Sequence, residues 1–167
     1  MNRIFITVLA GWALLATDSA MAGKVNIPRE GSYEFDFCLI GRGKTFTAGD
    51  KLFFIHYDVE AVLRSTPAGR AFDRMGARCL GVYYNLSGRE QEAGMCELTD
   101  LDGDKWWMEV RGKPDGNGGT YTAVYGTGKY DGMTLRGEYR PDNDWGSISK
   151  EVSIQGCNPN KGTYKLK

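Results

Sequence analysis

Three aspartates, Asp100, Asp102 and Asp104, lie around Gly103 at a spacing similar to that of a calcium-binding loop. In an EF-hand loop the glycine is sixth and a bidentate glutamate is twelfth. Counted from Asp100, glycine is fourth and Arg111 is twelfth. The Asp-Gly pair is instead typical of a two-residue β-hairpin turn, in which both positions need a positive φ. We therefore expect a hairpin here and no metal site.

The single histidine, His56, lies in the aromatic stretch Phe53–Val59. A hydrolytic triad would need a nucleophile on a sharp turn, and no G-x-S-x-G motif occurs. Alternation along a strand groups His56 with Phe54 and Asp58. We expect a structural histidine, and the sequence assigns no catalytic residue.

The glycine-rich stretch Gly126–Gly132 contains Lys129 and could suggest a phosphate-binding loop. The Walker spacing is absent, and no helix follows that could offer its N-terminus to a phosphate. We therefore expect a tight corner between two strands.

The four cysteines are Cys38, Cys79, Cys96 and Cys157. An even number favours two disulfides in an oxidising compartment. Zinc is the competing ligand, but the chain has no C-x-x-C pair and a single histidine. We expect disulfides.

The N-terminal residues predict export. Arg3 precedes an apolar run over Ile4–Ala16, and the small residues Ala20 and Ala22 follow. This order is that of a signal peptide over residues 1–22. The run is shorter than the roughly 20 residues that cross a bilayer. We expect a single periplasmic or secreted domain over residues 23–167, with no integral membrane segment after cleavage.

The formal net charge is +0, from Lys+Arg 21 and Asp+Glu 21. Nucleic-acid binding requires a basic face, so this balance gives no support for it. It gives no strong case for an anionic membrane surface either. No cofactor is expected.

The rest of the chain reads as short strands separated by turns, with Gly 23 against Pro 5. Their spacing of about a dozen residues is typical of an antiparallel barrel or sandwich. The expected strands are Tyr33–Ile40, Lys51–Val59, Leu80–Asn85, Glu92–Leu101, Asp104–Arg111, Thr120–Gly126, Thr134–Arg140, Ser147–Gln155 and Gly162–Leu166. Between them, Ala61–Ala77 carries several arginines and is expected to be a solvated loop, with a binding role as the alternative.

Two hairpins predict a register. A turn at Ser87-Gly88 places Cys79 opposite Cys96, close enough for a disulfide. Cys38 then pairs with Cys157 and joins the first strand to one of the last. A two-residue turn at Asp102-Gly103 places Glu97 opposite Met108.

This register puts one mostly apolar set on a shared face, which we take as the barrel interior. The set comprises Leu80, Val82, Tyr84, Ala93, Met95, Trp106, Met108 and Val110. Glu97 falls on the same face, where a carboxylate is costly unless it is paired. It is expected near a wet mouth, bonded to a tyrosine or arginine, or in a ligand site. Tyr84, Glu97, Trp106 and Met108 are the candidate lumen residues, with core packing as the alternative for Trp106.

A resemblance adds to this reading. The motifs that carry it are Cys79-Leu80-Gly81, Gly94-Met95-Cys96, Thr99–Lys105 and Gly126–Gly132, followed by Gly137 and Tyr139. Their order resembles a group of small exported bacterial proteins, and the glycine corner resembles that of the allene oxide cyclase and dirigent barrels. The resemblance implies a roughly eight-stranded antiparallel barrel, calycin-like or allene oxide cyclase-like, and raises a homo-oligomer as an expectation. It transfers no catalytic residue, because fold alone does not give function.

Three functions follow as hypotheses. The first is a non-enzymatic barrel that binds a small apolar ligand in its lumen. The second is an isomerase or cyclase that acts in the lumen with a carboxylate as acid or base. The third is an interaction or inhibitor protein of the cell envelope that makes its contacts through the Gly112–Gly119 loop and the arginine-containing segment Ala61–Ala77. We expect binding rather than catalysis.

Overall fold

The structure is a computed structural model that describes residues 27–49, 52–142 and 154–167. The predicted signal peptide, residues 1–22, lies outside the described residues, and so does most of the predicted strand Ser147–Gln155.

The described chain forms a single closed antiparallel barrel of eight strands in sequence order, which confirms the predicted fold class. A short 3₁₀ turn, η1, covers Gly128–Tyr130. The strands are β1 Glu30–Ala48, β2 Leu52–Ser65, β3 Gly76–Leu86, β4 Arg89–Thr99, β5 Lys105–Gly112, β6 Gly119–Gly126, β7 Thr134–Tyr139 and β8 Ile154–Lys165. The predicted strand Gly162–Leu166 is the second half of β8 rather than a separate element, and β8 pairs with β1 to close the barrel.

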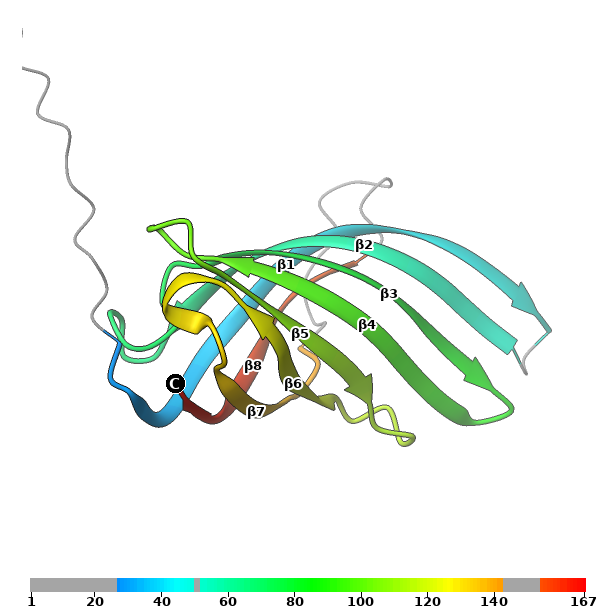
Figure 1. The fold of residues 1–167 in the computed structure, drawn as a ribbon. Coiled ribbons are helices and arrows are strands. Elements are labelled where there is room, and N and C mark those ends of the chain that lie inside the picture. The colour runs from blue at the N-terminus through cyan, green and yellow to red at the C-terminus, as the bar shows by residue number, and fades with distance from the viewer. Residues whose placement is uncertain (1–26, 50–51, 143–153) are drawn as a thin grey trace, which may run out of the picture.

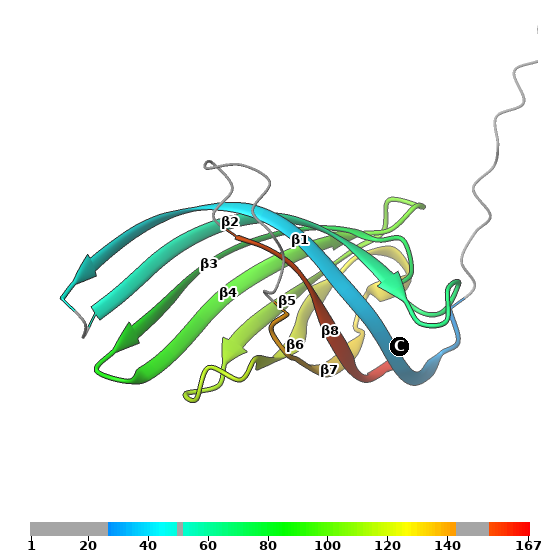
Figure 2. The same cartoon turned by 180° about the vertical axis from the view of Figure 1, so that it is seen from behind.

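The strands differ in length, and this shapes the barrel. β1 has 19 residues and β2 has 14, whereas β7 has 6. Figures 1 and 2 show β1–β4 as a long curved sheet that extends past the shorter strands β5–β7. The barrel therefore has two unlike ends.

One end is filled by the loop over residues 66–75. Its Phe72 has a φ of 67° and is 1% exposed, with its ring among those of Tyr33, Trp106 and Tyr164 at centroid distances of 5.1, 5.4 and 5.1 Å. The expectation of a solvated loop is thus wrong for the apolar part of this segment. An aromatic side chain inside the barrel removes more apolar surface from water than a loop lying on it would.

Asp73 holds this loop in place. Its carboxylate accepts hydrogen bonds from the amides of Ser65 (2.9 Å) and Gly69 (2.8 Å), and it is 8% exposed. Burial alone would raise the pKa of this carboxyl, but the two amides outweigh it and hold the pKa below its ordinary value. The ionised aspartate is therefore part of the closed end.

The β4–β5 register differs from the prediction by one residue. The Asp100 amide donates to the Asp104 carbonyl (3.0 Å), and Gly103, with a φ of 86°, completes a three-residue loop. The Asp100 carboxylate also accepts from the amides of Asp102 and Asp104. Because side chains alternate between faces, a one-residue slip moves every β4 side chain to the other face relative to β5. Glu97 consequently pairs with Trp107 instead of Met108.

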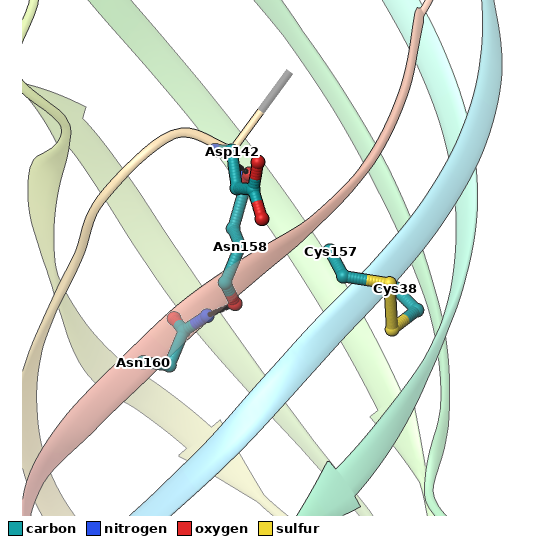
Figure 3. Close-up of a disulfide and its surroundings, with 5 residues drawn as sticks. All are labelled: Cys38, Asp142, Cys157, Asn158 and Asn160. Atoms are coloured by element: carbon teal, nitrogen blue, oxygen red, sulfur yellow. Dashed lines mark hydrogen bonds between the residues drawn. A yellow bond between two sulfur atoms is a disulfide. The ribbon is translucent and has the colours of Figure 1, made fainter. Parts of the chain in front are cut away.

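Both predicted disulfides are present. Cys79 and Cys96 are directly paired across β3 and β4, with a Cα–Cα distance of 4.0 Å, and they face the interior. Cys38–Cys157 joins β1 to β8 and faces outward (Figure 3). Figure 3 also shows the Asp142 amide donating to the Asn158 side chain (3.0 Å), which ties the chain beyond β7 to β8.

Candidate functional site

The structure places the four candidate lumen residues taken from the sequence in three different ways. Tyr84 faces outward and donates a hydrogen bond to Gln91 (2.6 Å). Glu97 also lies on the outer face, 2.6 Å from the Lys105 ammonium. Trp106 is inside with no exposed surface, packed against Phe72 at the closed end. Met108 lines a cavity in the other half of the barrel interior. The predicted site for Tyr84 and Glu97 is wrong because the interior face of β3 and β4 is the opposite one.

The other half of the barrel interior holds a cavity of about 570 Å³. This volume falls within the range of about 300–1,000 Å³ that is typical of small-molecule sites. The inward disulfide Cys79–Cys96 forms part of its wall. Its main apolar lining is Phe37, Leu39, Ile55, Val59, Met108 and Val110. The lumen is thus roomy at one end and filled at the other.

A carboxylate projects into this apolar space. Glu92 on β4 lines the cavity and accepts a hydrogen bond from the Tyr57 hydroxyl to Oε1 (2.7 Å). The Tyr139 hydroxyl donates to its Oε2. The two tyrosines come from β2 and β7, so a single glutamate connects opposite parts of the wall. No lysine or arginine among the described residues forms an ion pair with Glu92.

The phenols remain protonated donors. Burial, followed by the charge of Glu92, raises the pKa of Tyr57, and the same causes raise the pKa of Tyr139. Burial, followed by a hydrogen bond with Glu90, raises the pKa of Tyr83, which also lines the cavity. At neutral pH these groups therefore donate hydrogen bonds and carry no charge.

Glycines in the wall make room for this cluster. A Cβ on Gly81 would lie 2.4 Å from the Tyr57 Cζ, and one on Gly94 would lie 2.5 Å from the Tyr57 hydroxyl. A Cβ on Gly112 would lie 2.7 Å from the Cβ of Glu92. These glycines on β3, β4 and β5 let the two side chains lie flat against the barrel wall.

The remaining polar groups of the cavity include Lys113, Asn158 and Asn160. The Lys113 ammonium lies 3.9 Å from the Glu138 carboxylate, and the Asn160 side chain donates to the Asn158 carbonyl (2.6 Å). The partners of these groups lie apart from Glu92, which is the one carboxylate of the described cavity lining.

The three loop aspartates do form a cation site, but the protein supplies the cation. The Lys129 ammonium lies 2.6 Å from Asp100, 2.6 Å from Asp102 and 3.3 Å from Asp104. Burial alone would lower the pKa of Lys129, but the aspartates outweigh it and raise it well above its usual value. No group of acidic, histidine or cysteine side chains suited to a metal occurs in the part of the chain that the structure describes. His56 is exposed on the outer face of β2, away from the cavity.

The sequence reading missed Tyr57, Glu92 and Tyr139. The interior positions of β3 and β4 include Gly81 and Gly94, so these strands show no apolar alternation on their true inner face. A usable signal was present in the confirmed cystine, because Cys79 and Cys96 lie on the same face as Glu92.

The two disulfides fit a protein of an oxidising, extracellular or periplasmic compartment. Within the described residues, no helix is both long and apolar enough to cross a membrane. No protein-family model, curated protein or solved structure matches this chain.

Proposed function

We propose that the protein binds a small, largely apolar molecule in the open half of its lumen, in the periplasm or outside the cell. The observation that supports this is the cavity of about 570 Å³ with mainly apolar walls. Enclosing an apolar ligand there removes about 25 cal/mol of hydrophobic cost for each Å² buried. Wall residues such as Ile55, Val59 and Met108 supply this contact, in place of the outward Tyr84 and Glu97.

Two neighbouring residues on β2 offer a matched test. Ile55 faces the cavity and Phe54 faces outward. Ile55→Trp adds bulk inside the lumen, whereas Phe54→Trp adds bulk on the outer face. The probe is the neutral dye phenylnaphthylamine, whose fluorescence rises in apolar sites. We expect saturable binding by the wild type and Phe54→Trp, and weaker binding by Ile55→Trp. Equal binding by all three proteins, or binding by none, contradicts the proposal.

Native mass spectrometry of the gently purified protein identifies the natural ligand class. We expect a reproducible bound mass that disappears on denaturation. Because the described interior is not solid, the third hypothesis, contacts through exposed loops, gains no support from the structure.

An isomerase or cyclase is the second candidate, favoured by one observation: a carboxylate inside the cavity, Glu92, in contact with two phenols. Such groups can transfer protons to a held substrate. Incubating the ligand found by mass spectrometry with the protein should then yield a product of equal mass and different chromatographic retention. This conversion should stop in Glu92→Gln, and conversion that persists excludes Glu92 as the acid or base.

A further inference from the structure

The two opposite charges in the described cavity wall do not pair with each other. The described wall contains two charged side chains, Glu92 and Lys113. Lys113 is directed to Glu138, outside the group around Glu92. The described partners of Glu92 are the hydroxyls of Tyr57 and Tyr139, which are neutral. A carboxylate in apolar surroundings is stabilised far more by an opposite charge than by neutral donors alone.

The carboxylate of Glu92, which lines the cavity, has acceptor positions that its two described hydrogen bonds do not use. An ionised carboxylate offers about four lone-pair sites on its two oxygens, and one phenol hydrogen bond uses one of them on each oxygen. The remaining sites can accept from a ligand donor without displacing either tyrosine.

Several tyrosines share the cavity wall with Glu92. Tyr57, Tyr83 and Tyr139 all line the cavity, and each has an electron-rich face. Such faces attract a cation placed within about 6 Å of the ring centre. A carboxylate among tyrosine rings, next to walls of Ile55 and Val110, is complementary to a molecule with a positive end and an apolar body.

We propose that the lumen ligand is an apolar molecule that ends in an ammonium-type cation, which Glu92 binds beside the tyrosines of the cavity wall. This inference rests on the proposed function and specifies its ligand class. Glu92 selects the charge of the ligand, and the apolar walls accommodate its body.

Three ligands with one alkyl chain and different ends test the charge: decylammonium, decanol and decanoate, each below its micelle concentration. Their affinities for the purified, disulfide-bonded wild type are measured by calorimetry. We expect decylammonium to bind at least about tenfold more tightly than decanol, as a charge-assisted bond implies, and decanoate to bind most weakly. This comparison needs no variant and therefore does not depend on variant folding.

A matched pair of variants assigns the effect to Glu92. Glu92→Gln removes the charge and keeps a carbonyl acceptor for Tyr57. Glu97→Gln makes the same change on the outer face of the same strand. We expect Glu92→Gln to lose about tenfold or more in affinity for decylammonium and to keep its affinity for decanol. Glu97→Gln should change neither.

The outcomes separate the two proposals. Equal wild-type affinities for decylammonium and decanol overturn the ammonium inference and leave the lumen function standing. Unchanged decylammonium binding in Glu92→Gln also overturns it. Failure of all three ligands to bind, together with failure of the neutral dye, overturns the lumen function itself.

Discussion

Gly94→Ala should destabilise the protein through a single atom of Tyr57. The added Cβ would lie 2.5 Å from the Tyr57 hydroxyl oxygen, 3.1 Å from the Leu80 carbonyl and 3.5 Å from the Tyr57 Cζ. Overpacking of this kind costs about 1–3 kcal/mol. Displacing the hydroxyl also loses its bond to the Glu92 carboxylate, worth about 1.5–3 kcal/mol. We expect a loss of about 3–5 kcal/mol in the free energy of unfolding.

The geometry predicts which second change relieves the clash. Tyr57→Phe removes the hydroxyl, so Gly94→Ala in that background should cost less than about 1.5 kcal/mol, which makes the coupling between the two changes at least about 1.5 kcal/mol. Gly81→Ala should gain no such relief, because its Cβ would also lie 2.4 Å from the Tyr57 Cζ and 2.8 Å from the Ala93 carbonyl. Gly76→Ala is the control, since its Cβ meets nothing within 4 Å.

The assay is urea denaturation of the oxidised protein, followed by tryptophan fluorescence for each single and double variant. Gly76→Ala should be neutral or slightly stabilising, because alanine reduces the freedom of the unfolded chain. Additive costs of Gly94→Ala and Tyr57→Phe would refute the argument that the hydroxyl is the obstacle. Equal rescue of Gly81→Ala by Tyr57→Phe would refute the assigned ring position.

Three further predictions concern the closure of the barrel. Replacing Cys38 and Cys157 with alanine should lower the free energy of unfolding by about 5 kcal/mol, and replacing Cys79 and Cys96 should lower it by about 3 kcal/mol, because the sequence separations are 119 and 17 and the longer loop gains more chain entropy when the bond is lost. Equal losses of unfolding free energy in urea denaturation would contradict this order. Asp73→Asn should lower stability by about 1–3 kcal/mol at neutral pH. The folded-state pKa of Asp73 is lowered, so the stability difference between the wild type and Asp73→Asn should have its full size above about pH 4 and shrink as the pH falls through the folded-state pKa. A stability difference that does not change with pH would exclude the ionised carboxylate as its cause. Lys129→Met should lower the melting temperature because it leaves three aspartates close together without their cation. Added salt should reduce the difference in melting temperature between the variant and the wild type. An unchanged melting temperature would show that the ion pairs of Lys129 do not stabilise the fold.

The barrel and its cystines could be predicted from the sequence because their signals are local. Turn residues mark each hairpin, and Ser87-Gly88 forms the two-residue turn, with positive φ at both positions, that places Cys79 opposite Cys96. The same rule failed at Asp102-Gly103. There the Asp100 side chain accepts from two loop amides and stabilises a loop one residue longer.

The candidate site was harder to predict because its signal lies between distant strands. Glycines such as Gly81 and Gly94 occupy interior positions so that a ring from β2 can fill the space. The alternation of apolar and polar residues along one strand does not identify such a face as interior, because glycine has no apolar side chain. Of the four residues proposed from sequence, Met108 alone lines the described cavity. The role of Glu92 depends on contacts between three strands, β2, β4 and β7, which no local sequence pattern indicates.

The two disulfides face opposite sides of the same wall, and this divides their access to reducing partners. Cys38–Cys157 lies on the outer surface, where the thiol of another protein can approach it. Cys79 and Cys96 are 4% and 2% exposed and open only onto the cavity. In the folded protein, a thiol-exchange enzyme can therefore reach the bond that closes the barrel, whereas the inner bond is reached only by a reductant small enough to enter the lumen. Any molecule that fills the lumen also shields the inner bond from reduction.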